Sequence, residues 1–422
     1  MPELDQGWVR LGPAAALQND DDWITAEIMG RPVFVQRFGG DLRGFENLCA
    51  HRFYPLRTEA RGNGPILCGF HHWRYAADGS LRGAPQCREQ FGVKPDELGA
   101  KLQPIEIQSL DGEVFGRLLP RGGKWEPLRY APMGADWARP MSDPAAFAAE
   151  QAALGEGWAF LGMARERRTQ DAQETARCGD FLFGRPSGAG PDLETWLGDL
   201  FPILAVLSKA GGRRHRASFP VAANWRLCLH ITLEDYHLLA VHPDTVGRDG
   251  PRLREDLGYF CAGPHIAQFT ENTSGALKAM AQACREGTWR SSQYRIFHVF
   301  PNLLVSHFSA RDEYWYVQVQ HVVPLSSGRS RIDSWIFPAA VAPLGARPPH
   351  DRWMGRWTRP WRSAIVDRMV ARILREDTRA CATLQRSVAQ IDRPPFLAAV
   401  EERIGWFEEA YRAAMTWGRA NP

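Results

Sequence analysis

The sequence predicts an α+β fold in two parts, and three patterns support this class. Short strand-like runs separated by turn residues fill residues 23–122. Four longer strand-like runs follow one another closely between residues 294 and 337, and two stretches of helical character come after them. Strands grouped apart from helices are typical of α+β proteins. With 422 residues, 44% of them hydrophobic and 23% charged, the chain is long enough for two globular domains, which we place at residues 1–145 and 146–422.

The first part is expected to be a small all-β domain. Residues 32–37 are strand-like, residues 38–41 indicate a turn, and residues 42–47 indicate a second strand. Asp111-Gly112 is a typical hairpin dipeptide between the strand-like residues 102–107 and 113–118.

The second part is expected to combine an antiparallel sheet with helices. Residues 122–144 contain four prolines and indicate a connection, and residues 193–207 are predicted to be helical. Consecutive strands at short spacing favour an antiparallel sheet. The strand-like runs are residues 294–300, 303–308, 314–323 and 330–337, and the later predicted helices are residues 361–388 and 396–415, separated by Pro394-Pro395.

Composition narrows the class of function. A formal net charge of +3 gives no support for a nucleic-acid partner. Residues 1–9 carry Glu3 and Asp5 and no long apolar run, so no secretory signal is expected, and no apolar stretch is long enough to span a bilayer. Eight cysteines in a chain of this length do not form a disulfide framework. We therefore expect a cytoplasmic protein without a nucleic-acid or membrane partner.

Two short motifs predict a metal cluster. Cys49-Ala-His51 and Cys68-Gly-Phe-His71 each hold one cysteine and one histidine, with sixteen residues between His51 and Cys68. Two thiolates and two imidazoles in this paired order are the ligands of a Rieske [2Fe–2S] centre, in which the imidazoles raise the reduction potential. Zinc takes the same ligands, but zinc fingers usually group the two cysteines together and the two histidines together. The C-x-x-H spacing selects His71 rather than His72.

A second metal site is predicted at His237 and His242. Five residues turn a regular α-helix by about 140° beyond one full turn, so two rings at this spacing on an unbroken helix do not face one ion. Pro243 disfavours helical backbone at His242. We therefore expect the helix to end, or to carry a π-bulge, between the two histidines, which would turn both imidazoles inward. Two ordinary core histidines are the alternative that the spacing leaves open.

A mononuclear iron site would need a carboxylate besides the two histidines. Two histidines and one carboxylate on one face of iron(II) leave positions open for dioxygen and substrate. Asp377, on the predicted helix 361–388, is the expected carboxylate, and Glu376 is the alternative. By themselves these two acids resemble any solvated helix face among arginines.

Over roughly residues 23–411 the chain resembles the large (oxygenase) subunit of the Rieske non-haem iron oxygenases, also called aromatic-ring-hydroxylating oxygenases. The two cluster motifs and the His237-x4-His242 spacing carry most of the resemblance. The other matching positions are residues 42–49, Trp73, Asp78-Gly79, Pro85, Asn224-Trp225, Glu234, Tyr236, Pro301-Asn302-Leu303, residues 335–338, and Glu376-Asp377 with Gln385.

The resemblance implies a Rieske [2Fe–2S] domain joined to a helix-grip, START-like catalytic domain with an antiparallel sheet, usually assembled as a ring of three. A small β subunit in the ring is left open. Dioxygen would be the cosubstrate, and electrons would come from a separate ferredoxin or reductase, because no nicotinamide or flavin fingerprint such as G-x-G-x-x-G is visible. NAD(P)H would then act only through that partner. The implied cluster ligands are Cys49, His51, Cys68 and His71, and the implied ligands of the mononuclear iron are His237, His242 and Asp377.

The resemblance also implies an electron bridge at Glu234. In the family an acidic residue at this place links a cluster histidine of one subunit to an iron histidine of the next, and the matching residues here are His71 and His237. Glu234 and His237 are three residues apart and would share a helical face. A carboxylate bonded to a ligand imidazole fixes its tautomer and raises its basicity. A buried acid paired with an arginine is the alternative for Glu234.

The sequence departs from the family pattern at several positions. Glu234 stands where aspartate is usual, which is similar to members that act on carnitine and related quaternary ammonium compounds. Phe53 and His72 stand where glycines are expected after the two cluster motifs, so the packing of the cluster loops is in question. His230-Ile231 replaces a Glu-Asn pair, and His230 therefore either faces the pocket or is a satisfied core histidine.

We expect a Rieske mono- or dioxygenase that hydroxylates an aromatic or other largely apolar small molecule, in the catabolism of aromatic hydrocarbons. The Phe, Leu and Trp residues of the second part motivate this substrate class, although such residues are mostly core. The alternative enzyme is a monooxygenase or demethylase of a quaternary ammonium compound, motivated by Glu234 and by tryptophans able to form a cation–π cage. An electron-transfer protein without oxygenase activity is the alternative from another class, and the presence of all three expected iron ligands argues against it.

Overall fold

The computed structural model describes residues 7–120, 133–134, 136–164, 174–186, 190–249, 252–310, 314–344 and 349–420. The chain forms two compact units: unit 1 comprises Met1–Ala138, Asp235–Pro251 and Ala382–Glu401, and unit 2 comprises Arg139–Glu234, Arg252–Cys381 and Glu402–Pro422. Much of the predicted connection at residues 122–144 lies outside the described residues. The predicted division between residues 145 and 146 stays a prediction.

Unit 1 is built on a seven-stranded antiparallel sheet with the strand order β1-β9-β8-β4-β3-β2-β5. The predicted strands at residues 32–37 and 42–47 are confirmed as β3 and β4, and the Asp111-Gly112 hairpin is confirmed between β8 and β9. Asp111 and Gly112 have φ values of 51° and 81°, as a two-residue turn with both central residues at positive φ requires. The strands are β1 (Val9–Pro13), β2 (Asp22–Ile28), β3 (Arg31–Phe38), β4 (Asp41–Glu46), β5 (Arg61–Asn63), β8 (Pro104–Leu110) and β9 (Glu113–Leu118).

The rest of unit 1 consists of short elements from distant parts of the chain. The small strands β6 (Arg74–Tyr75) and β7 (Leu81–Gly83) pair with each other and are followed by α1 (Cys87–Phe91). The later segments contribute one turn of helix, α6 (Leu238–Val241), and three 3₁₀ helices, η3 (Val246–Asp249), η5 (Val388–Gln390) and η6 (Ala399–Glu401). One more 3₁₀ helix, η1 (Ala14–Ala16), follows β1.

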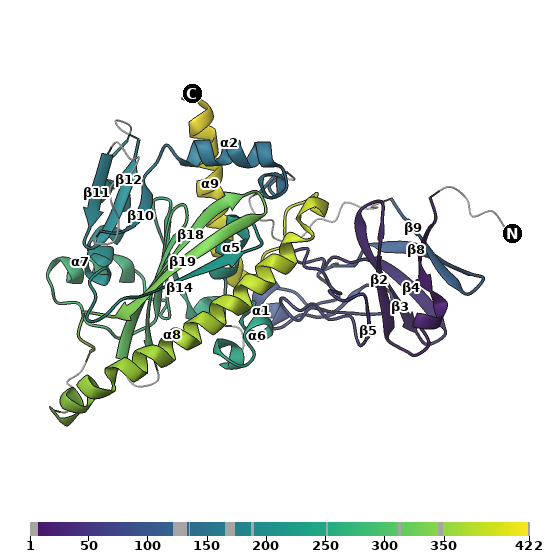
Figure 1. The fold of residues 1–422 in the computed structure, drawn as a ribbon, viewed down its shortest axis with the longest axis horizontal. Helices are drawn as coiled ribbons and strands as arrows, with labels where there is room; N and C mark the ends of the chain where they lie inside the picture. The colour runs from purple at the N-terminus through teal and green to yellow at the C-terminus, as the bar shows by residue number, and fades with distance from the viewer. Residues whose placement is uncertain are drawn as a thin grey trace. The chain divides into compact units, whose positions relative to one another are not determined.

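Unit 2 is built on a second seven-stranded antiparallel sheet with the order β13-β19-β18-β17-β16-β15-β14. The four predicted strands between residues 294 and 337 are confirmed as β16 to β19, each paired with the next (Figure 1). The strands of this sheet are β13 (His215–Val221), β14 (Gly258–Ala262), β15 (His265–Phe269), β16 (Arg295–Val299), β17 (Leu303–Ala310), β18 (Tyr314–Ser326) and β19 (Arg329–Pro338). A three-stranded sheet is formed by β10 (Ala159–Met163), β12 (Phe181–Arg185) and β11 (Glu174–Cys178).

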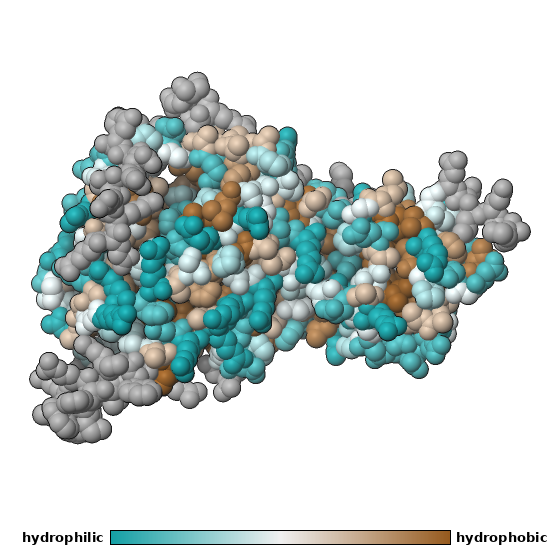
Figure 2. All heavy atoms as spheres, viewed as in Figure 1, coloured by the Kyte–Doolittle hydropathy of each residue, from teal (hydrophilic) through white to brown (hydrophobic). Residues whose placement is uncertain are grey.

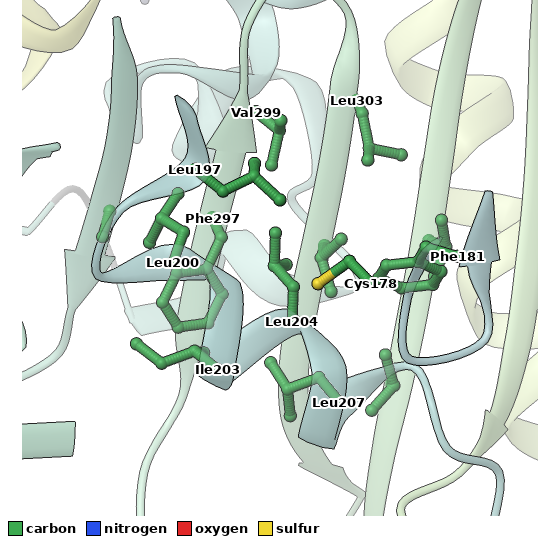
Figure 3. Packing of buried hydrophobic residues seen from close by; sticks show 14 of the residues in the cluster. Cys178, Phe181, Leu197, Leu200, Ile203, Leu204, Leu207, Phe297, Val299 and Leu303 are labelled. Carbon is green, nitrogen blue, oxygen red and sulfur yellow. The ribbon is translucent and has the colours of Figure 1, made fainter. Parts of the chain in front are cut away.

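One face of the large sheet packs against helices in an apolar core. Figure 3 shows Leu200, Ile203, Leu204 and Leu207 beside strand residues that include Phe297. These leucines and the isoleucine lie on α4 (Leu200–Leu207), which follows α3 (Leu193–Leu197), and α7 (Ala276–Arg285) packs on the same cluster. The predicted helical stretch at residues 193–207 is present but divided into two helices, because Gly198 adopts φ 54° and ψ −127°, a conformation that interrupts a helix.

The opposite face of the sheet is covered in part by α8 (Pro349–Gln385), the long helix in Figure 1. Val366, Val370 and Leu374 of α8 pack against Tyr316 and Ile336. The predicted helix at residues 361–388 is therefore present but begins earlier, at Pro349. The predicted helix at residues 396–415 is present as α9 (Glu402–Ala420) and begins later, after η6. The remaining helices of unit 2 are α2 (Pro144–Leu154), α5 (Trp225–Thr232), η2 (Arg139–Met141) and η4 (Arg254–Asp256).

A buried ionic network holds α5 against α2 and α9. Arg226 of α5 donates to both oxygens of Glu408 on α9, at 3.2 and 2.5 Å, and its guanidinium lies 3.8 Å from Glu150 of α2. Glu150 also accepts hydrogen bonds from Trp225 (2.8 Å) and Tyr411 (2.7 Å). Although burial raises the pKa of Glu408, Arg226 and His230 lower it to about 2. Because each buried charge faces an opposite charge, α5 is fixed in place where the chain approaches His237.

The described helices include none that is both long enough and apolar enough to cross a bilayer. On the face of the molecule in Figure 2, hydrophilic residues are spread between smaller groups of hydrophobic ones.

Candidate functional site

The two cluster motifs form two loops with the same backbone hydrogen bonds. The N–H of Cys49 donates to Tyr54, and the carbonyl of Cys49 accepts from Phe53. The N–H of Cys68 donates to Trp73, and its carbonyl accepts from His72. Each cysteine is thus bonded to the residues four and five positions later, which turns both loops toward their own cysteine.

Phe53 and His72 are the two residues that stand where the family pattern expects glycine. Their φ values are 59° and 56°, in the left-handed region that glycine favours. Both positions therefore adopt a backbone conformation that suits glycine although they carry side chains. A left-handed residue with a Cβ costs about 1–2 kcal/mol, so both loops carry some strain. Phe53 is buried, with the Arg393 guanidinium 5.4 Å from its ring centroid, whereas His72 is partly exposed.

The four predicted cluster ligands lie together in unit 1 and are all buried. Nδ1 of His51 and Nδ1 of His71 are 3.0 Å apart, and the thiols of Cys49 and Cys68 are within hydrogen-bonding reach of each other. Two imidazole nitrogens this close need a proton or a metal ion between them. Two thiols on one side and two imidazoles on the other fit a [2Fe–2S] cluster in which one iron takes cysteine and the other takes histidine. The choice of His71 over His72 agrees with this geometry.

Aromatic side chains surround the cluster ligands. The Tyr75 hydroxyl accepts a bond from the Ala50 N–H at 3.0 Å, which leaves its proton to donate to the Cys49 sulfur at 3.1 Å. The Trp73 ring stacks on His51 with centroids 4.6 Å apart, and the Tyr236 ring stacks on His71 at 5.1 Å. A hydrogen bond to a cluster sulfur and a dry surrounding both tune the reduction potential.

Glu401 is a residue of this site that the sequence did not reveal. Its Oε2 accepts from Nε2 of His51 at 2.9 Å, and its Oε1 lies 2.8 Å from Arg52 Nη1. Burial raises the pKa of Glu401, but His51 and Arg52 lower it to about 2, so the carboxylate is ionised. No local motif signals a partner that is 350 residues from His51.

Hydrogen bonds to the first cluster loop hold Glu401 in place. The Ser387 hydroxyl donates to the Phe53 carbonyl at 2.7 Å, and the Phe396 N–H donates to the His51 carbonyl at 3.1 Å. The Ala398 N–H donates to Glu401 itself at 2.6 Å. The segment 382–401 is therefore bonded to the loop at several points. This docking places the Glu401 carboxylate beside His51.

His237 and His242 lie at the two ends of α6, both buried, with ring centroids 5.2 Å apart. The predicted helix end between them is present, because α6 ends at Val241, but α6 is a short helix separate from α5. Helix α5 already ends at Thr232, and the turn between the histidines is an ordinary α-turn, in which Val241 N–H donates to the His237 carbonyl. Because this separate short helix stops at His242 (φ −121°, ψ 44°), just before Pro243, the two rings meet. Glu234, which is buried, lies after the end of α5, so the expected shared helical face with His237 is absent.

The two candidate carboxylates on α8 differ in their surroundings. Glu376 accepts from Arg372 at 2.9 Å in a partly exposed pair one helical turn apart. Asp377 is buried. His230, which was expected either in a pocket or in the core, forms a 2.8 Å hydrogen bond with Glu408 in the buried network.

The cluster donors and the second histidine pair are neighbours in unit 1. The Phe70 ring lies 4.0 Å from the His71 ring and 6.4 Å from the His237 ring, measured between centroids. Phe70 belongs to the second cluster motif, so one aromatic side chain contacts both sets of metal donors.

Comparison with protein families gives two matches. Residues 7–103 match the Rieske [2Fe-2S] domain, and residues 209–417 match the ring hydroxylating alpha subunit (catalytic domain). Both candidate donor sets lie inside the matched residues.

Curated relatives match over a shorter stretch. The carnitine monooxygenase oxygenase subunit of Escherichia coli (strain K12) is 32% identical over 113 residues, which is 26% of this chain and 29% of that protein. The large oxygenase component of the 2,4-dinitrotoluene dioxygenase system of Burkholderia sp. (strain RASC) is 30% identical over 115 residues, 26% of this chain and 25% of that protein. The match thus spans less than a third of these relatives. Among solved structures, naphthalene 1,2-dioxygenase from Rhodococcus sp. bound to indole has a TM-score of 0.36 and 18% identity over 97% of this chain and 89% of that chain.

Replacing Glu401 with glutamine should raise the reduction potential of the cluster. The substitution removes a negative charge that touches His51, and such a charge disfavours the added electron. We expect an increase of about 50 mV, close to the ~59 mV that corresponds to a tenfold change for one electron. A redox titration followed by EPR measures it.

The matched control is Glu402→Gln. Glu402 is the next residue, and it pairs with Arg254 at 2.7 Å in a more exposed place. Its replacement should leave the potential unchanged. A Glu401→Gln potential equal to or below that of the unchanged protein would contradict the role assigned to Glu401.

Proposed function

Because the chain belongs to the family of large (oxygenase) subunits of the Rieske non-haem iron oxygenases, we propose that it activates dioxygen with electrons from a separate ferredoxin or reductase. In this proposal it is a mono- or dioxygenase that hydroxylates an aromatic or other largely apolar substrate. NAD(P)H serves only that partner protein. The alternative from another class, an electron carrier without oxygenase activity, would need only the cluster.

One observation carries the proposal: the Phe70 ring contacts a cluster ligand, His71, and also His237 of the second histidine pair. A carrier has no need of a second buried pair of histidines beside its cluster. An oxygenase needs both, because single electrons must reach the place where dioxygen reacts.

The donor residues fit two metal groups. We assign Cys49, His51, Cys68 and His71 to the [2Fe–2S] cluster, and His237 and His242 with one carboxylate to the mononuclear iron. When bound, the cluster supplies single electrons and the iron(II) supplies the site of dioxygen activation. The chain's own residues orient these groups and exclude water from them.

Asp377 is the carboxylate that we assign to the iron. Its burial on α8 supports the choice, because buried ionised carboxylates in proteins are paired or coordinate metals. Glu376 already has a partner in Arg372. We assign Glu234 to an electron bridge between the cluster histidine of one subunit (His71) and the iron histidine of the next (His237), in addition to the path past Phe70 within one chain.

The remaining parts of the proposal follow family membership. We propose a homotrimer in the cytoplasm that takes part in the catabolism of aromatic hydrocarbons, with or without a small β subunit. The domains would be residues 1–145, holding the cluster, and residues 146–422, holding the mononuclear iron.

A second candidate substrate class is a quaternary ammonium compound such as carnitine or a betaine. It is favoured by the similarity to the carnitine monooxygenase oxygenase subunit and by Glu234 in place of aspartate. Turnover of substituted benzoates against carnitine, betaine and stachydrine, with dioxygen uptake and product measured together, separates the two classes. We expect product from the aromatic set, and turnover of the cations alone would reverse the assignment.

Replacing Asp377 with alanine should remove one iron per chain. The protein with both groups bound should contain about three irons per chain, two in the cluster and one mononuclear. Asp377→Ala should lower this to about two while the Rieske EPR signal after dithionite stays. Glu376→Ala, one residue away on the same helix, is the control and should keep all three. Equal iron contents in the two variants would refute Asp377 as a ligand.

Replacing Glu234 with glutamine should slow electron transfer without removing metal. The amide keeps the size of the side chain but loses the charge that links two ligand imidazoles. We expect the rate of cluster oxidation coupled to product formation to fall about 10–100-fold, measured by stopped-flow absorbance with iron content unchanged. Asp235→Asn, the adjacent acid, serves as the control. An unchanged rate in Glu234→Gln would remove Glu234 from the electron path.

A further inference from the structure

One face of the large sheet of unit 2 carries buried polar side chains where a packed core would be apolar. This is the face on which α8 packs against Tyr316 and Ile336, opposite to the apolar core of Figure 3. None of the six residues is charged in its ordinary state, and all are less than 9% exposed. They are Gln268, His298, Ser306, Gln318, Gln320 and Ser334, here called the polar face.

Two members of the polar face are in register across neighbouring strands. His298 on β16 pairs with Leu304 on β17, and Leu304 pairs with Gln320 on β18. Directly paired residues of a sheet point to the same side. Neighbouring strands lie about 4.8 Å apart, so His298 and Gln320 are about 10 Å apart with the buried, apolar Leu304 between them. Both side chains therefore lie on the same side of the sheet, one on each side of Leu304.

The hydrogen bonding of His298 fixes which of its nitrogens carries the proton. Its Nε2 is 3.0 Å from the carbonyl of Pro301, and a carbonyl only accepts, so Nε2 is the donor. Burial lowers the pKa of His298 to about 3, although the Pro301 bond raises it, so the ring is neutral near pH 7. Nδ1 therefore presents a lone pair, and within the described part of the chain no group donates to it.

Gln320 provides a second acceptor on the same face. Its Oε1 is buried, and no donor from the described residues reaches it. A buried acceptor left without a donor costs about 1–3 kcal/mol. Two of them, in register on one face of a sheet, indicate a ligand that donates hydrogen bonds.

The surroundings of His298 connect it to the helix that leads to the second histidine pair. The Phe407 ring of α9 contacts His298 at 5.4 Å and His230 of α5 at 5.9 Å. Arg403, also on α9, is buried with its guanidinium 4.9 Å from the Tyr259 ring, and its charge contributes to the lowered pKa of His298. The positive charge of Arg403 therefore already lies near His298, at one end of the polar face.

We propose that His298 and Gln320 are specificity-determining residues that accept hydrogen bonds from an O–H or N–H group of the substrate, whose apolar ring lies over Leu304. The substrate class is then an uncharged hydroxylated or N–H-bearing ring compound. This inference rests on the proposed oxygenase function and narrows it, because a plain hydrocarbon and a quaternary ammonium group both lack the donor.

Binding of matched ligand pairs tests the inference without turnover. The probes are phenol against anisole and 2-naphthol against 2-methoxynaphthalene, titrated by calorimetry into the oxidised holoenzyme without reductant. Each pair keeps the ring and the oxygen but differs in the O–H donor. In at least one pair the hydroxyl compound should bind about tenfold more tightly.

Three variants test whether His298 and Gln320 cause the tighter binding of the hydroxyl compounds. His298→Phe keeps an aromatic ring against Phe407 and should reduce the ratio to about twofold or less, and Gln320→Leu should reduce it about threefold. His307→Phe is the control, since His307 is buried on β17 but lies against Trp289 and Trp315 and bonds Ser291. It should keep the ratio of the unchanged protein.

Each result bears on the inference. It is overturned if the unchanged protein binds no probe or shows no preference in either pair, or if the ratio survives in both His298→Phe and Gln320→Leu. Should His298→Phe fail to fold, an unchanged ratio in Gln320→Leu is sufficient to overturn it. Failure of the proposed function gives a different result: no substrate would support dioxygen uptake, while the binding ratios could still be measured.

Discussion

The cluster site depends on the placement of two imidazole nitrogens, Nδ1 of His51 and Nδ1 of His71, 3.0 Å apart in a fully buried place. Two lone pairs at this separation are unfavourable unless a positive centre lies between them. Glu401 accepts a hydrogen bond from Nε2–H of His51 on the far side of the ring, which leaves the Nδ1 lone pair available for a metal. At the fourth position after each cysteine, Phe53 and His72 adopt positive φ and donate their N–H groups to the cysteine carbonyls, which closes both ligand loops. A metal bound at the two Nδ1 atoms would therefore relieve the repulsion between their lone pairs, and Glu401 would stabilise the ligand form of His51.

Unit 2 also contains buried charged groups, but it stabilises them with protein partners of opposite charge. Around α5 each buried charge has an opposite charge close by: Arg226 bonds Glu408, and Glu408 also bonds His230. A network with satisfied partners makes a rigid support, and here it anchors α5 to α9. On the polar face of the sheet, by contrast, two buried acceptors find no donor in the described part of the chain. The contrast separates a structural polar cluster from a face prepared for a ligand.

Local patterns were enough to predict the strands β3, β4 and β16 to β19 and the Asp111-Gly112 hairpin, because each depends on residues close in sequence. The division between α3 and α4 was missed, since Gly198 within an apolar run gives only a weak breaker signal. The end of α5 before His237 was missed for a related reason: Pro243 predicted a stop near His242, but nothing local predicted an earlier one. Glu401 could not be predicted, because its role depends on a segment that docks 350 residues away in the chain. The alternation of Val317, Gln318, Val319 and Gln320 indicates a strand with one polar side, but it does not tell whether that side meets water or a ligand.

A substrate bound at the polar face in the way proposed would be selected among the substrate classes on energetic grounds. A plain aromatic hydrocarbon would gain about 25 cal/mol per Å² of buried apolar surface but would seal off His298 Nδ1 and Gln320 Oε1 without donors, at about 1–3 kcal/mol each. A quaternary ammonium compound would meet the same penalty at its head group, which has no N–H, and would bring a second positive charge toward Arg403. A hydroxylated or N–H-bearing ring keeps the apolar gain and removes at least one penalty. The difference of one such penalty corresponds to about five- to more than a hundredfold in binding. The same two side chains would therefore select the substrate and fix its orientation.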